Sequence, residues 1–172
     1  MQEQVILVDD QDNEIGTCEK LKAHREGLLH RAFSAFIFNS ENKMLIHQRA
    51  LGKYHSEGLW TNACCSHPRP NETVLDAVKR RLPEEMGISC DLQKAFCVCY
   101  NVQVSQNLIE HEYDHVFIGT FNGDTIRPNP DEVAAYRWIA KDDLLEEMSY
   151  APQTFTKWFH LALPKVLNLQ NI

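Results

Sequence analysis

Hydrophobic and polar residues alternate along several short segments of the chain, which is the pattern of partly buried β-strands. These segments run over residues 4–8, 31–38, 43–49, 58–65, 96–104, 110–121 and 134–139. Turn-forming residues separate some of them, notably in the acidic stretch 9–13 and in the loop 39–42. The loop 39–42 predicts a hairpin between the strands on either side of it. The chain is therefore predicted to contain a substantial β-sheet.

Apolar residues recur at helical spacing over residues 73–82, 141–148 and 152–169. Asn71 or Thr73 is placed to cap the first of these helices, and Gly87 to end it. Two prolines disturb the pattern. Pro83 predicts a kink near the end of the first helix, and Pro164 a break in the last one. Because strands and helices are mixed along the chain, we expect an α/β fold with a mixed β-sheet layered between helices.

Composition narrows the possible classes of protein. The 172 residues, 44% hydrophobic and 24% charged, suit a single domain over residues 1–172. No apolar run reaches the roughly 18–20 residues of a membrane helix, and the N-terminus does not resemble a signal peptide. We therefore expect a cytoplasmic protein whose six cysteines are reduced. A net charge of −7 argues against binding to nucleic acid, so an anionic ligand would need a local basic cluster or bound cations.

The segment 60–68 brings reactive side chains close together. Cys65 and His67 are two residues apart, so on a strand both would point to one face and Cys64 to the other. A thiol can exchange a proton, and an imidazole nitrogen can bind a metal ion. A cysteine in such a run is more often a simple packing residue. The pair nevertheless suggests proton chemistry at a metal site.

A set of histidines and glutamates is suited to a divalent cation. Its members are His24, His30, His67, Glu110 and Glu112. On a strand Glu110 and Glu112 would project from one face, and Glu112 is also a candidate for proton transfer that Tyr100 would orient. Nitrogen and oxygen ligands in this number suit Zn²⁺, Mn²⁺ or Mg²⁺. The chain has eight histidines, so spacing alone leaves structural or solvent-exposed roles open.

The run R-R-L-P-E-E-M-G-I, from Arg80 to Ile88, resembles the core of the Nudix box, R-E-U-x-E-E-x-G-U, where U is apolar. Counting back along the box matches Glu72 with its early glutamate and Ser66 with its first glycine. Arg81 replaces a glutamate that usually helps Nudix hydrolases to hold the magnesium ions for diphosphate cleavage. The resemblance therefore implies a phosphate-binding helix with an incomplete hydrolytic set.

Motifs along nearly the whole chain resemble one Nudix-fold family, the type I isopentenyl-diphosphate isomerases of isoprenoid synthesis. The most specific motif is T-N-x-C-x-H-P, which runs from Thr61 to Pro68. The other matching segments are 19–20, 23–24, 29–34, 48–51, Lys53, 58–60, 110–112 and 155–158. The resemblance implies a metal-dependent isomerisation of isopentenyl diphosphate to dimethylallyl diphosphate.

The resemblance also assigns roles by position. Cys65 and Glu112 match the pair that donates and accepts a proton, with Tyr100 beside Glu112, and which of the two donates stays open. The ligands of one divalent ion (Mn²⁺, Mg²⁺ or Zn²⁺) match His24, His30, His67, Glu110 and Glu112. A second Mg²⁺, which arrives with the substrate, matches Glu85. The cationic clamp on the diphosphate matches Lys20, Arg49, Lys53 and Arg81. Trp158 matches an indole wall of the pocket, and Trp60 is expected to help exclude water.

The implied reaction passes through a tertiary carbocation, formed when the terminal carbon of the double bond gains a proton. Loss of a proton from C2 then gives the allylic isomer. The expected partner is a small-molecule diphosphate, with no membrane and no nucleic acid, and the expected state is a monomer or weak dimer. Two alternatives remain open: a Nudix hydrolase of a nucleoside diphosphate derivative, and a non-catalytic Nudix-like binding module.

Overall fold

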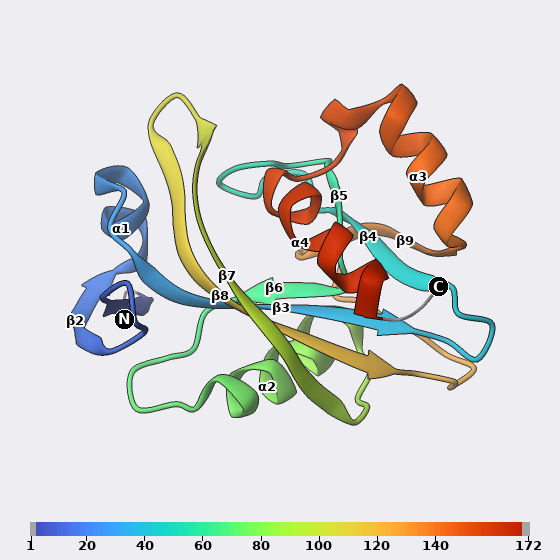
Figure 1. The fold of residues 1–172 in the computed structure, drawn as a ribbon, viewed down its shortest axis with the longest axis horizontal. Helices are drawn as coiled ribbons and strands as arrows, with labels where there is room; N and C mark the ends of the chain where they lie inside the picture. Colours follow the sequence, from blue (N-terminus) through green and yellow to red (C-terminus); the bar gives the residue numbers. More distant parts are fainter. Residues whose placement is uncertain (1–2, 170–172) are drawn as a thin grey trace.

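The structure is a computed structural model that describes residues 3–169 (Figure 1). Its strands are β1 (Gln4–Val8), β2 (Glu14–Glu19), β3 (His30–Phe38), β4 (Met44–Arg49), β5 (Trp60–Thr61), β6 (Cys64–Ser66), β7 (Leu92–Ser105), β8 (Leu108–Thr120) and β9 (Val133–Ile139). Its helices are α1 (Lys20–Glu26), α2 (Val74–Met86), α3 (Lys141–Tyr150) and α4 (Lys157–Leu169), with a short 3₁₀ turn, η1 (Pro152–Thr154). No helix within residues 3–169 has the length and apolar character needed to cross a membrane.

The central strand β3 organises the sheet. It pairs antiparallel with β1, β4 and β6, and parallel with β8. Phe33 and Ile37 pack with α2 in one core, whereas Phe36 and Phe38 pack with α3 and α4 in the other. Successive side chains of a strand point to opposite faces, so this one strand supplies both cores. The predicted mixed sheet between helices is confirmed, with α2 on one side and α4 on the other (Figure 1).

Replacing Leu163 with alanine is expected to lower the free energy of unfolding by about 2–5 kcal/mol, because it leaves a cavity beneath α4. Leu163 is 2% exposed, whereas Leu161 on the same helix is 42% exposed. Leu161→Ala is therefore the matched control, with an expected change within about 0.5 kcal/mol. Urea unfolding followed by circular dichroism measures both, and equal losses would contradict this packing of α4.

The single strand predicted over residues 58–65 is wrong. The chain leaves its partner β4 at the end of β5 and joins β3 at the start of β6. Asn62 stabilises this switch, because its side-chain amide donates to the carbonyls of Ala35 at 3.1 Å and Cys64 at 2.9 Å. A change of partner within one apolar run depends on tertiary contacts, so the alternation pattern does not reveal it.

Both proline-containing helices continue past their prolines. α2 runs through Pro83 to Met86, and it keeps its predicted ends, with Thr73 as its N-cap and Gly87 as its left-handed C-cap at φ 68°. α4 runs through Pro164 without a break, although it begins only at Lys157. Each helix buries an apolar face against the sheet, and such packing outweighs the local cost of one proline.

Sequence reasoning missed β2 and α1. The carboxylate of Glu19 caps α1 by accepting the N–H groups of Leu21 at 2.9 Å and Lys22 at 2.8 Å. Gly27 ends the helix in the left-handed region, at φ 63°. Seven residues show too little periodicity to predict a helix, so these two caps were the available signals. α1 carries Lys20 and His24, two of the predicted site residues.

Candidate active site

Five buried polar side chains converge where β3 begins, and their ligand atoms all lie within 4.8 Å of one another. This histidine–glutamate cluster consists of His24, His30, His67, Glu110 and Glu112. His24 comes from α1, His30 from the start of β3, and His67 follows β6. Parallel pairing of β3 with β8 sets His30 directly beside Glu112. The structure therefore brings together all five residues that the sequence suggested as metal ligands.

The imidazole rings of the cluster are oriented from outside. Nδ1–H of His24 donates to the carbonyl of Lys20 at 2.7 Å, and Nδ1–H of His30 donates to that of Leu28 at 2.8 Å. These bonds assign the ring protons to Nδ1 and leave the Nε2 lone pairs facing the centre of the cluster. Nε2 of His30 lies 3.2 Å from Nε2 of His67. Nitrogens that face one another in this way suit a shared cation.

The carboxylates of the cluster face the same centre. Oε2 of Glu110 lies 3.2 Å from Nε2 of His24, and Oε1 of Glu112 lies 2.8 Å from Nε2 of His67. Within residues 3–169, Nε2 of His24 and Oε2 of Glu110 are buried without a hydrogen-bond partner. Orphaned buried atoms of this kind fit a site for a divalent ion.

The pKa shifts of both carboxyls and of His67 support the same interpretation, whereas the contact with Glu110 outweighs burial and raises the pKa of His24. Burial favours protonation of Glu110 and Glu112, but their contacts with the histidines hold the pKa of both carboxyls below the usual value. Burial lowers the pKa of His67 to about 3, so this imidazole is neutral at neutral pH. Ionised carboxylates and neutral imidazoles are the protonation states in which these groups bind metals.

Cys65 lies at the end of the pocket nearest to α4. Its thiol donates to Oδ1 of Asn62 at 2.9 Å, and Nε1–H of Trp158 donates to its sulfur at 3.2 Å. Burial raises the pKa of this thiol to about 12, so it is protonated at neutral pH. Cys64 is fully buried in the core beneath α2. Cys65, and not Cys64, therefore opens into the pocket.

The pocket next to Cys65 also holds Glu112, and it is lined by His67, Glu110 and Trp158. The hydroxyl of Tyr100 donates to Oε2 of Glu112. Burial raises the pKa of Tyr100 well above its usual value, which keeps this hydroxyl a donor.

Trp60, which is expected to help exclude water, is not among the residues that line the pocket at Cys65. The guanidinium of Arg137 stacks 4.5 Å from the centre of the Trp60 ring, which packs against the core beneath α4. β5 pairs with β4 at this point, so the position of the Trp60 side chain is set by strand pairing in the sheet.

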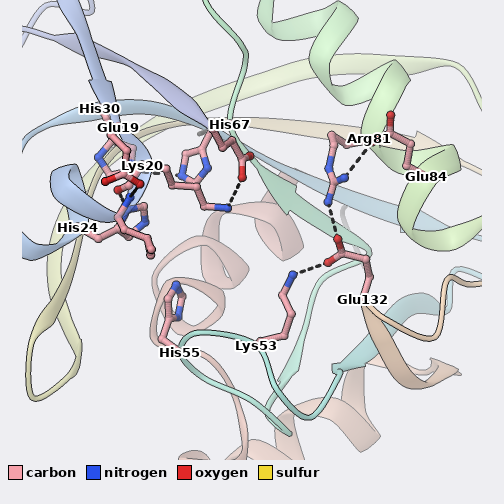
Figure 2. Close-up of polar contacts among 12 residues, drawn as sticks. Glu19, Lys20, His24, His30, Lys53, His55, His67, Arg81, Glu84 and Glu132 are labelled. Atoms are coloured by element: carbon pink, nitrogen blue, oxygen red, sulfur yellow. Dashed lines mark hydrogen bonds and ion pairs between the residues drawn. The ribbon is translucent and has the colours of Figure 1, made fainter. Parts of the chain in front are cut away.

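The second compartment of the pocket is strongly cationic and is lined by Lys20, Arg49, Lys53 and Arg81. Figure 2 shows Glu132 between Lys53 and Arg81, with an ion pair to each, and the pair to Arg81 is 3.1 Å long. Arg81 also contacts Oε1 of Glu85 at 2.5 Å. The two compartments share Arg49, Cys65 and His67, so they form one continuous site.

The residues of this site that were missed from the sequence include Tyr54, His55 and Glu132. All three lie in loops, where no periodic pattern indicates which side chains turn inward. Tyr54 lines both compartments, and Nζ of Lys20 lies 4.8 Å from the centre of the Tyr54 ring. Only the folding of their loops over the sheet brings these residues to the site.

Known proteins share the domain and much of the sequence of this chain. The NUDIX domain family matches residues 28–159. An isopentenyl-diphosphate Delta-isomerase from Burkholderia multivorans is 53% identical over 165 residues, which cover 96% of this chain and 93% of that relative. Isopentenyl-diphosphate Delta-isomerase 2 from Aromatoleum aromaticum is 46% identical over 172 residues, covering 100% of this chain and 90% of that relative.

Solved structures share the fold. The protein DR0079 from Deinococcus radiodurans is 19% identical with a TM-score of 0.69, over 86% of this chain and 90% of its own. A MutT NUDIX hydrolase from Burkholderia pseudomallei is 24% identical with a TM-score of 0.63, over 80% of this chain and 98% of its own. Such identities support the predicted Nudix-like fold and nothing finer. Together with the near full-length relatives, they show that this chain belongs to the NUDIX family and, within it, to the isopentenyl-diphosphate Delta-isomerases.

Proposed function

We propose that Cys65, Glu112 and the histidine–glutamate cluster carry out the reaction of this isomerase, the conversion of isopentenyl diphosphate to dimethylallyl diphosphate. One observation carries the proposal. A thiol and a carboxylate that can exchange protons open into one pocket, beside a compartment lined with cations. Proton exchange at an alkene and retention of an unreactive diphosphate need these two features next to each other.

The chemistry requires one proton to be added and another to be removed. Protonation of the terminal alkene carbon forms a tertiary carbocation, and loss of a proton from C2 moves the double bond. In the ligand-free protein Cys65 holds its proton and Glu112 is ionised, so the pair begins with one transferable proton. After one turnover the pair again holds one proton, because the proton given to the terminal carbon is replaced by the proton removed from C2. Tyr100 orients Glu112 for this exchange.

Exclusion of water protects the carbocation. Trp158 lines the pocket at Cys65, where Glu112 is buried and Cys65 is partly buried. An indole face close to a desolvated cation contributes about 2 kcal/mol. Trp158 therefore stabilises the intermediate and also holds the thiol through its N–H group.

We assign a divalent ion, Mn²⁺, Mg²⁺ or Zn²⁺, to the histidine–glutamate cluster. Three imidazoles and two carboxylates suit any of these ions. When bound, the ion would neutralise the two carboxylates and tune the proton affinity of Glu112. Glu85, buried at the edge of the cationic compartment, is assigned to a second Mg²⁺ that accompanies the diphosphate.

Replacing Arg81 with glutamine is expected to raise KM for isopentenyl diphosphate about 10–100-fold with a smaller change in kcat, because a charge-assisted hydrogen bond contributes about 1.5–3 kcal/mol. The adjacent Arg80 is the matched control. It pairs with Glu72 at 2.7 Å and lies outside the cationic compartment. Steady-state kinetics should therefore give Arg80→Gln an unchanged KM. An equal rise in both variants would contradict the role of Arg81.

The hydrolase alternative has less support. Arg81 stands where hydrolases of this family usually have a metal-binding glutamate, and its guanidinium already contacts Glu85. The curated relatives described above are named as isomerases. A cation at this position suits retention of a diphosphate better than its cleavage.

Proton NMR with isopentenyl diphosphate and Mg²⁺ in deuterated water tests the proposed function. We expect dimethylallyl diphosphate to appear with deuterium incorporated into the product. Unchanged substrate in the presence of folded, metal-loaded protein would contradict the proposal. Release of phosphate from nucleoside diphosphate derivatives would instead support the hydrolase alternative.

We further propose a cytoplasmic enzyme that acts as a single domain, as a monomer or weak dimer, on a small-molecule diphosphate. All six cysteines are free, as a reducing compartment would keep them. Size-exclusion chromatography with light scattering measures the oligomeric state.

A further inference from the structure

His55 is a buried histidine to which the proposed reaction gives no role. It lies in the loop between β4 and β5, and its side chain is 2% exposed. Its ring centre is 6.0 Å from that of His24 and 5.8 Å from that of Trp158. His55 therefore lies between the histidine–glutamate cluster and the indole wall of the pocket, and Figure 2 shows it below His24.

The ring of His55 faces an oxygen of the cluster. Its Nε2 lies 2.6 Å from Oε1 of Glu110, in a close electrostatic contact that is not a linear hydrogen bond. The hydroxyl of Ser56 lies 3.1 Å from Nδ1. A hydroxyl donating to Nδ1 leaves the ring proton on Nε2, the nitrogen that faces Glu110.

The two oxygens of Glu110 consequently have different neighbours. Oε2 faces His24 at the centre of the cluster, at 3.2 Å, whereas Oε1 faces His55 on the outside. Contact at the outer oxygen restricts rotation of the carboxylate about its terminal C–C bond. Its inner oxygen then stays directed at the centre, even though the group is fully buried among other ionisable groups.

The loop that carries His55 is itself anchored. The guanidinium of Arg49 donates to the carbonyls of His55 and Ser56, both at 3.1 Å. Gly52 N–H also donates to the carboxylate of Glu57 at 2.7 Å. The position of the imidazole is therefore set by the loop backbone as well as by its contact with Glu110.

We propose that His55 is a positioning residue that holds the outer oxygen of Glu110 and thereby raises the affinity of the histidine–glutamate cluster for a divalent ion. This inference rests on the metal assignment within the proposed function. Partners of this type, which contact a ligand and not the ion, typically change metal affinity about 10–100-fold when they are removed.

Metal affinity can be measured without the isomerase reaction. Apo-protein is titrated with Zn²⁺ in competition with a chromophoric chelator, and its fold is checked by circular dichroism. His55→Ala is expected to weaken zinc binding about 10–100-fold. In His55→Gln the side-chain amide N–H can take nearly the position of the imidazole Nε2–H, so its zinc affinity should stay within about 3-fold of wild type. The side chain of asparagine is shorter, so His55→Asn should bind zinc as weakly as His55→Ala.

His160→Ala is the matched control. The ring of His160 also contacts one oxygen, the carbonyl of Pro152 at 2.8 Å, but it lies on α4 away from the cluster. Its zinc affinity should equal that of wild type.

Three results would overturn the inference. Unchanged affinity in His55→Ala and His55→Asn would remove the role of His55. Equal weakening in His55→Gln and His55→Asn would assign the effect to ring packing and not to the contact with Glu110. If the wild-type protein bound no zinc, the metal assignment and this inference would both fail, while the NMR assay would still report separately on isomerisation. If His55→Ala did not fold, the comparison of glutamine with asparagine would decide the question.

Discussion

Serine in place of Cys65 is expected to reduce turnover of isopentenyl diphosphate by about 10³-fold or more, because proton transfer by a positioned group contributes up to about 10⁴-fold. The hydroxyl of serine is a far weaker acid than a thiol, and in its neutral form it is a poor base. The loss is therefore expected whichever of Cys65 and Glu112 donates the proton. The NMR assay in deuterated water measures the remaining rate.

The variant should keep its fold, because a hydroxyl can still contact Asn62 and the N–H group of Trp158. Cys64→Ala is the control: it removes the neighbouring thiol, which lies in the core beneath α2. We expect this control to lose some stability and to retain turnover. Activity close to wild type in Cys65→Ser, or its loss in folded Cys64→Ala alone, would show that the chemistry is assigned to the wrong residue.

Removal of divalent ions is expected to reduce turnover by at least about 10³-fold, since a catalytic metal typically contributes several kcal/mol. Without a cation, two buried carboxylates and three imidazole nitrogens face one another. Dialysis against a chelator, with elemental analysis to verify the loss, is followed by an assay of the apo-protein. Addition of Mn²⁺, Zn²⁺ or Mg²⁺ in turn should restore activity and rank the ions.

Metal removal should also lower the Tm, because an ion that binds only the folded state stabilises it by about 2.7 kcal/mol at a concentration 100 times its Kd. This measurement separates the two assigned ions, since the second Mg²⁺ arrives with substrate and is absent from such a melt. Full activity of protein shown to be free of metal would refute the catalytic role of the cluster.

Local sequence patterns predicted most of the elements that build the sheet. The hairpin of β3 and β4, the long strands β7 and β8 and helix α3 follow the expected alternation or helical spacing closely. The errors lie where the context of an element overrides its local preference. Pro164 remains inside α4 because that helix is packed on the sheet, and the run 58–65 divides because its two halves pair with different strands.

For the site, the sequence by itself determined which residue types are present and which motifs contain them. The T-N-x-C-x-H-P motif, the paired glutamates of β8 and the arginine within the Nudix box are continuous in the chain, so they are visible without a structure. Only the tertiary structure decided that they meet. The parallel register of β3 and β8 places His30 beside Glu112, and the opposite faces of β6 separate Cys65 from Cys64. His55 and Glu132 reach the site from loops, because local patterns record which face of an element is buried but not which distant segments pack against it.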